Sequence, residues 1–175
     1  DHAGEMGDFS AISPGTHEEV GPLGTKSVAF SNSSYELADH YGWSNTYTVV
    51  ALAVKDTNHT GSVIANKGTN DIRGHAPIQF NGNDVRQFYF TYARSQNVEF
   101  KVASTTAAAN GDWGFYFARM AQGNIALITN GGANATTAAS DSVAVTSEPT
   151  RLGEQTDGGN VLDGSIGLLA VWDEP

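Results

Sequence analysis

The side chains that could hydrolyse a glycosidic bond lie far apart in this sequence. Such cleavage needs two facing carboxyl groups, about 5 to 9 Å apart. Most acidic residues stand singly at turns, and Glu99 alternates with apolar neighbours like the solvent side of a strand. The histidines are scattered through predicted loops, with no serine or cysteine nucleophile in a catalytic context: His2, His17, His40, His59 and His75. We therefore predict no catalytic residues and no enzyme.

Aromatic side chains in one polar loop indicate binding instead. A pyranose stacks its apolar face on an aromatic ring, while polar groups at the edge fix its hydroxyls. Tyr41 and Trp43 stand between two strand-like runs, with His40 and Asn45 beside them. These four residues are our candidate glycan-binding residues at the rim of the molecule. The alternative is that one or both rings close an end of the hydrophobic core.

Oxygen-rich loops raise the question of a metal ion. The stretches 81–84 and 157–163 are rich in Asn, Asp and Gly, and a net charge of −10 would tolerate Ca²⁺. Ca²⁺ takes roughly six to eight oxygen ligands, several of them charged, and neither stretch has that spacing. Tight turns need the same residue types. We predict no metal site and no cofactor, although the composition would permit Ca²⁺.

Composition and charge exclude several other classes. In 175 residues, nine basic residues stand singly among 19 acidic ones, so the basic stripe of a nucleic-acid-binding protein is missing. The chain has no cysteine, which removes disulfides and thiolate metal sites and favours a microbial or viral source. No apolar run approaches the ~18 residues of a membrane-spanning helix. We predict neither a nucleic-acid partner nor membrane insertion.

The stretch 111–132 predicts a β-hairpin. Trp113, Phe115 and Phe117 alternate with other residues at a period of two, a loop containing Gly follows, and a second strand covers 125–129. We expect the rings of this hairpin to fill the core.

Short strands between turn signals account for the rest of the chain. The run 47–55 is apolar on both sides and predicts a central strand. We expect Trp172, which ends a late strand, to lie in the core. No window keeps the apolar spacing of a helix. Further strands are predicted at 27–30, 34–37, 62–67, 78–80, 88–92, 98–102, 143–145, 151–153 and 166–172. The pattern predicts an all-β fold, an antiparallel two-sheet β-sandwich without substantial helix.

The first 23 residues differ in composition from the rest. They hold five acidic residues and no Lys or Arg. We interpret 1–23 as an extended N-terminal arm and 24–175 as the folded domain. The arm is expected to pack along a neighbouring subunit of a homo-oligomer or larger assembly; a loosely attached tail is the alternative.

Four phrases, in order, resemble the laminin-G-like, concanavalin-A-like jelly-roll family. They are GTKSVAFSNSSYEL (24–37), TYTVVALAVKDTNHTGSVIANKG (46–68), the hairpin at 113–131 and LDGSIGLLAVWD (162–173). The resemblance covers nearly the whole chain and implies two facing antiparallel sheets of roughly six or seven strands, with a loop-built rim or concave face that often binds glycans. One departure concerns the metal. Family members often have an acidic pair after the isoleucine of the closing strand, whereas Ile166 is followed here by Gly167 and Leu168.

The leading hypothesis is a non-enzymatic jelly-roll module for surface adhesion or recognition of a glycan or surface polysaccharide. It would act extracellularly, displayed on a virion or cell surface. A second hypothesis is a viral (phage) capsid decoration or fibre protein with the sandwich as an exposed knob. A polysaccharide-active enzyme is the third.

Overall fold

The computed structural model describes fourteen β-strands and no α-helix. The described residues are 9–13, 16–18, 24, 26–37, 46–65, 74–82, 84–93, 96–104, 107–121, 124–130, 135–138, 149–155 and 158–172. The predicted strand at 143–145 lies outside these ranges. The others each fall on an observed strand, with boundaries shifted by up to four residues.

The strands form two sheets of seven. The first sheet has the order β1 (Phe9–Ser13), β4 (Ser34–Leu37), β13 (Arg151–Leu152), β6 (Gly61–Ala65), β7 (Gly74–Asn81), β8 (Asp84–Ala93) and β9 (Gln96–Ala103). The second has the order β12 (Ala135–Ala138), β11 (Asn124–Thr129), β10 (Gly114–Ala121), β5 (Tyr47–Lys55), β14 (Gly164–Trp172), β3 (Ser27–Phe30) and β2 (Thr16–Glu18).

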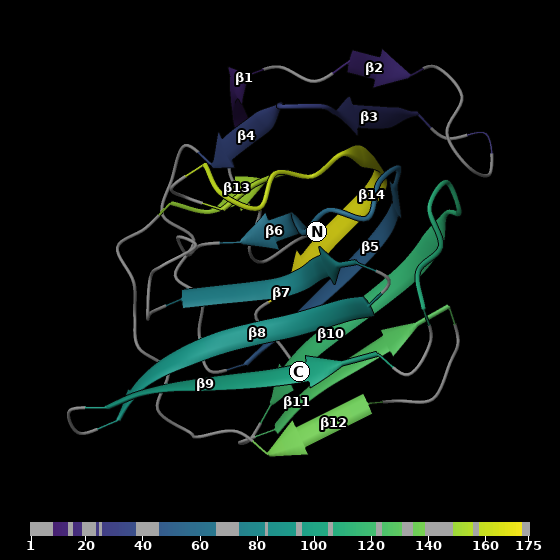
Figure 1. Cartoon of the computed structure of the whole chain (residues 1–175). Coiled ribbons are helices and arrows are strands. Elements are labelled where there is room, and N and C mark those ends of the chain that lie inside the picture. Colours follow the sequence, from purple (N-terminus) through teal and green to yellow (C-terminus); the bar gives the residue numbers. More distant parts are fainter. Residues whose placement is uncertain are drawn as a thin grey trace.

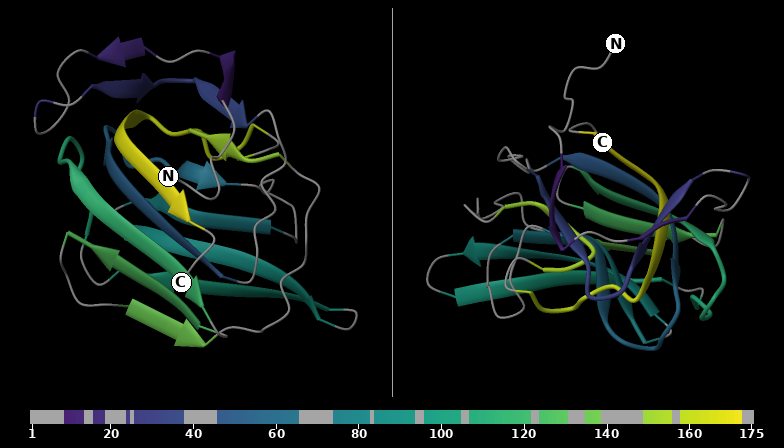
Figure 2. Two further views of the ribbon diagram at one scale, coloured as in Figure 1. Left: turned by 180° about the vertical axis from the view of Figure 1, so that it is seen from behind. Right: turned by 90° about the horizontal axis from the view of Figure 1, so that it is seen from above.

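The two sheets lie face to face. In Figure 1, β7, β8 and β9 cross in front of β10, β11 and β5. The left view of Figure 2 shows the molecule from behind, with β14, β5 and β10 nearest the viewer. Neighbouring strands pair antiparallel. The predicted antiparallel two-sheet sandwich is therefore confirmed, and β5 is central in its sheet, as its apolar sequence predicts.

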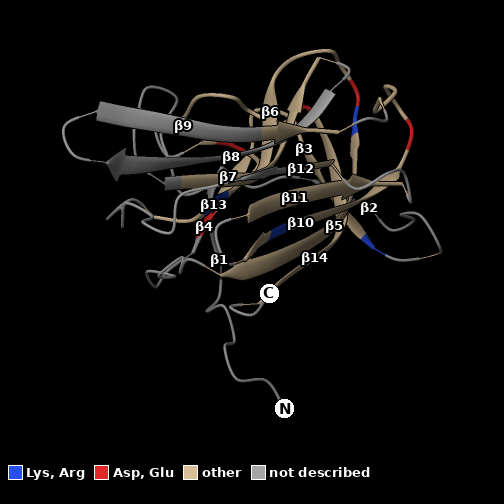
Figure 3. Ribbon diagram, turned by 90° about the horizontal axis from the view of Figure 1, so that it is seen from below, with Lys and Arg blue, Asp and Glu red and all other residues tan. Residues whose placement is uncertain are grey.

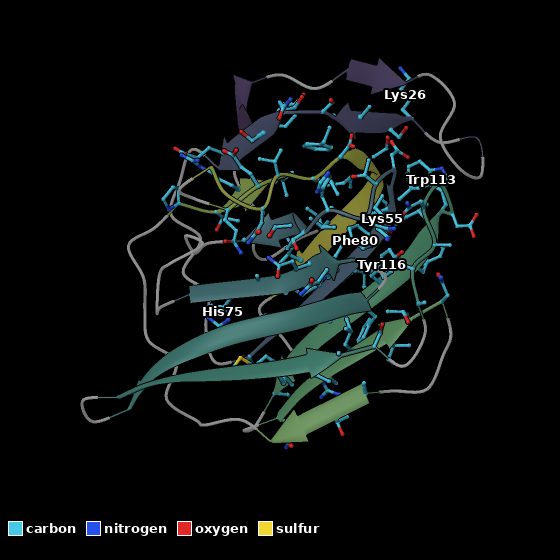
Figure 4. All side chains as sticks on the ribbon, in the orientation of Figure 1. Lys26, Lys55, His75, Phe80, Trp113 and Tyr116 are labelled. Carbon is cyan, nitrogen blue, oxygen red and sulfur yellow. The ribbon has the colours of Figure 1, made fainter. Side chains whose placement is uncertain are left out.

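Aromatic pairs join the sheets across the core. The ring of Phe80 on β7 meets that of Tyr116 on β10 edge to face, with centroids 5.2 Å apart. His75 on β7 meets Tyr47 on β5 in the same way, also at 5.2 Å. Figure 4 shows Phe80 and Tyr116 side by side, and His75 further along β7. His75 is thus a core residue in a strand, not a loop residue as the sequence led us to expect.

The hairpin of β10 and β11 is present, but its large rings mostly point away from the core. Tyr116, Ala118 and Met120 face inward and are buried. Phe115 is 49% exposed, and Phe117 is half-buried on the same outer face. The expectation that the alternating rings fill the core was wrong. A period of two separates two sets of residues but does not say which set faces inward.

Trp172 is also outside the core, because β14 contains a bulge. Ile166 pairs with Ala53 and faces inward, whereas Leu168, two residues on, pairs with Leu52 on the outer face. The extra residue, Gly167, reverses the facing of every residue after it. Trp172 is 50% exposed as a result, which corrects its predicted core position.

The N-terminal segment contributes a strand to one edge of each sheet. β1 pairs with β4, and β2 pairs with β3. Residues 9–13 and 16–18 therefore hydrogen-bond along their own chain. His17, predicted in a loop, lies in β2.

Candidate functional site

The four predicted rim residues, His40, Tyr41, Trp43 and Asn45, lie outside the described residues. Their part in glycan binding therefore stays a prediction. Within the described ranges, two other surfaces offer chemistry. One is the outer face of the second sheet, and the other is a pocket at one end of the sandwich.

The outer face of the second sheet carries an apolar surface built from cross-strand rows. Phe115, Leu52 and Leu168 form one row across β10, β5 and β14. The next row is Ile128, Phe117, Val50 and Ala170, and the third is Ala126, Arg119, Thr48 and Trp172. We call the eight larger apolar or ring positions of these rows the outer platform: Val50, Leu52, Phe115, Phe117, Ile128, Leu168, Ala170 and Trp172.

Three side chains of the outer platform are unusually accessible. Phe115, Leu168 and Trp172 are 49%, 44% and 50% exposed, respectively. Leu52, between Phe115 and Leu168 in the register, is only 5% exposed, because these two side chains flank it on both sides. Scattered exposed apolar residues are normal, but a contiguous apolar patch on a soluble domain marks an interaction surface.

Polar groups border the outer platform without breaking it. Arg119 and Asn124 are exposed, and Thr48 lies between Arg119 and Trp172. Among the outward-facing residues of β11, β10, β5 and β14 that the structure describes, there is no carboxylate, and Arg119 is the sole cation. In Figure 3, β11 and β14 are tan and the blue on β10 marks this arginine. The surface therefore combines rings with hydrogen-bond donors and acceptors, as sugar recognition requires.

The pocket lies where three turns meet, and it has a volume of about 560 Å³. It is lined by Ser31, Asn32, His59, Thr60, Asn160, Val161, Leu162 and Asp163. Backbone hydrogen bonds fix its walls: Asp56 N–H donates to Asp163 O, and Ser62 N–H donates to Asn160 O, both at 2.8 Å. Its hydroxyl, amide and carboxylate groups suit a hydroxyl-rich ligand, but its lining residues include no carbocyclic ring on which a sugar could stack.

A buried lysine holds two turns together. Lys55, at the end of β5, is 2% exposed, and its Nζ donates to Asn58 Oδ1 at 3.0 Å and to the carbonyl of Gly82. Burial lowers the pKa of this ammonium. Lys55 thereby links the β5–β6 turn, which carries His59 of the pocket, to the turn between β7 and β8. We assign it a structural role.

A second buried group lies nearby on β10. Burial, together with the charge of Asp112, raises the pKa of Tyr116 to about 12. The phenol therefore stays neutral at physiological pH, and its ring packs against Phe80 in the core. We assign this residue, too, a structural role.

Two other kinds of feature are absent from the described residues. No group of three or more His, Cys, Asp or Glu side chains gathers as a metal site would require. No helix in these ranges is long and apolar enough to cross a membrane.

The outer platform was not predicted, although the sequence contains two signals for it. Phe115 and Tyr116 are adjacent, so one large ring of the hairpin had to face outward whichever set filled the core. The second signal is Gly167, a flexible residue inside a strand, which is a common mark of a bulge.

No protein-family model matches this sequence, and no curated protein matches it. The fold, in contrast, is shared with many solved structures. Domain 4 of AbnA, an extracellular GH43 arabinanase from Geobacillus stearothermophilus solved with arabinotriose, aligns with a TM-score of 0.71 and 17% identity, covering 97% of this chain and 84% of that one. The CBM40 domain of a Ruminococcus gnavus IT-sialidase, bound to α2,3-sialyllactose, aligns with a TM-score of 0.65 and 14% identity, covering 95% and 90%.

Domains LG4–5 of the mouse laminin α1 chain align with a TM-score of 0.57 and 11% identity over 94% of this chain. This chain spans only 41% of the laminin structure and 44% of the binding domain of botulinum neurotoxin serotype D. At these identities the comparisons establish architecture alone. The protein has the laminin-G-like, concanavalin-A-like jelly-roll fold.

Proposed function

We propose that this chain is a non-catalytic module that recognises glycans through the outer platform. The observation that carries the proposal is the exposure of Phe115, Leu168 and Trp172 on one sheet face, with the exposed Arg119 in the row of Trp172. Aromatic rings on a sheet present a stacking surface at little cost in side-chain entropy, and the polar groups beside them can bind hydroxyls.

Two neighbours with this fold, described above, were solved with bound sugars. That association supports the proposal as an analogy of fold. The site itself has to be argued from the residues of this chain. The pocket at the end of the sandwich is the competing location, and we rank it second because its one ring, the imidazole of His59, offers a smaller stacking face than Phe115 or Trp172.

We further propose that the module has no hydrolytic activity. Catalysis would require paired carboxyl groups in a site, and the outward-facing described residues of β11, β10, β5 and β14 have none. The pocket is lined by a single carboxylate, that of Asp163. Its place of action is proposed to be extracellular, on a virion or cell surface. Antibody labelling of intact particles or cells tests this; labelling that requires lysis would contradict it.

A glycan array, followed by calorimetry on the ligands it identifies, tests the proposed function. We expect Trp172→Ala and Phe115→Ala each to lower affinity by roughly tenfold, with thermal unfolding almost unchanged because both side chains are half exposed. Asp163→Asn serves as the matched control in the pocket and should bind as the wild type does. The rim prediction is tested alongside by Tyr41→Ala and Trp43→Ala.

Each result has a separate meaning. No bound glycan on the array refutes the proposed function. If Asp163→Asn abolishes binding and Trp172→Ala leaves it unchanged, the glycan binds in the pocket and not on the outer platform. Release of sugar fragments from a bound polysaccharide would overturn the non-catalytic assignment.

A further inference from the structure

The two exposed rings of the outer platform lie at opposite corners of it. Phe115 belongs to the first row on β10, and Trp172 to the third row on β14. These positions differ by two strand spacings and four residues along a strand, so their Cα atoms are about 16 Å apart. Val50 and Thr48 lie on β5, the strand between them. One pyranose ring cannot contact both aromatic side chains.

The size of the outer platform limits its occupant. Four strands about 4.8 Å apart, over five residues of about 3.3 Å each, span roughly 300 Å². A stable protein–protein interface buries about 800 Å² on each partner. The outer platform is therefore too small for a lasting contact with a second copy of the chain, but large enough for several sugar rings in a row.

Charge limits the occupant further. The chain carries a net charge of −10, so a polyanion approaches it against long-range repulsion. The described outward-facing residues of these strands contribute one cation, Arg119, to offset that field. A neutral chain of sugars meets no such repulsion, and its hydroxyls can accept hydrogen bonds from the exposed guanidinium of Arg119.

We propose that the outer platform binds an internal stretch of a neutral polysaccharide, which lies diagonally from Phe115 on β10 to Trp172 on β14. This inference rests on the proposed glycan-recognition function and adds two statements to it. The ligand is an extended chain, not a single terminal sugar, and it is uncharged. The two rings then act as separate stacking positions along one ligand.

The test begins with affinity electrophoresis of the full chain. The gels contain cellulose-type β-glucan, xylan, arabinan, mannan or, as an acidic polymer, polygalacturonate. The retarding polymer is then supplied as oligosaccharides of one to six sugars, and affinities are measured by calorimetry. We expect retardation by a neutral polymer, and affinity that rises with length and levels off once the oligosaccharide reaches both rings.

Two variants separate chain binding from end binding. Trp172→Ala and Phe115→Ala should each lower affinity for the hexasaccharide by roughly tenfold and flatten its dependence on length. Asp163→Asn, in the pocket at the end of the sandwich, is the control and should keep the wild-type length dependence. Thermal unfolding of each variant shows whether the domain is intact.

The outcomes distinguish this inference from the function on which it rests. No retardation by any polymer, together with an empty glycan array, refutes the function itself. Equal affinity for monosaccharide and hexasaccharide refutes the extended ligand and leaves glycan recognition standing. Retardation by polygalacturonate alone, lost in Arg119→Gln, refutes the neutral ligand.

Discussion

His75 should make this protein less stable in mild acid. The imidazole is 1% exposed, packs edge to face on Tyr47, and lies between the two sheets. Burial lowers its pKa from 6.5 to about 3. Between these values the unfolded chain binds a proton that the folded chain excludes, so the free energy of unfolding falls as the pH is lowered from about 6.5 towards 3.

The size of this effect follows from the two pKa values. Each pH unit between them corresponds to about 1.4 kcal/mol, so the buried imidazole costs about 2 kcal/mol at pH 5 relative to pH 7. In His75→Leu this term is absent. The variant should therefore lose about 2 kcal/mol less than the wild type on moving from pH 7 to pH 5, whatever its stability at neutral pH.

Urea unfolding followed by tryptophan fluorescence at pH 5, 6 and 7 measures the effect. Gln79→Leu is the matched control, because Gln79 is a buried, non-titrating residue on the same strand, hydrogen-bonded to Ser62. It should lower stability but keep the wild-type dependence on pH. The reasoning fails if the unfolding free energy of His75→Leu depends on pH as that of the wild type does. It also fails if NMR shows that the imidazole of the folded wild type is protonated at pH 5.

Two further predictions concern the packing of β14 and the N-terminal segment. Gly164→Ala should destabilise the domain by about 2 to 4 kcal/mol. The new Cβ would collide with the backbone carbonyl of Val54 and would lie 2.8 Å from the Cα of Lys55. An unchanged urea midpoint would show that β5 and β14 can move apart. The sequence-based prediction that residues 1–23 pack along a neighbouring subunit is tested by sedimentation velocity of the full chain, and a full chain that sediments as a monomer would refute it.

The architecture was predictable because strand signals in this sequence are strong and local. Alternating apolar residues, Gly and Asn turns and the absence of helical spacing identify the sandwich, and the apolar run 47–55 identifies its central strand β5. The family resemblance added the facing sheets. These features depend on neighbouring residues, which the sequence displays directly.

Which side chains of a strand face the core was not predictable, because this depends on packing against residues far along the chain. The hairpin presents two sets of side chains, and its own sequence does not say whether Phe115 or Tyr116 faces the core. The contact that distinguishes them is the packing of Tyr116 against Phe80 of the other sheet. The histidine at position 75 looked like part of a loop, since its neighbours Gly74 and Pro77 are turn residues. Tertiary packing nevertheless draws it into β7.

The bulge at Gly167 decides which side chains at the end of β14 face outward, because one extra residue in a strand shifts the alternation of every residue after it. If the same residues paired without the bulge, with Gly167 itself opposite Leu52, Trp172 would turn inward and Leu169 and Val171 would turn outward. Two chains almost identical in composition could then differ completely in what they bind. Deletion of Gly167 would instead leave these residues facing as they do now, because it is the unpaired extra residue. In relatives of this protein, an insertion or deletion between Gly167 and Trp172 that no bulge absorbs would reverse the facing of the tryptophan.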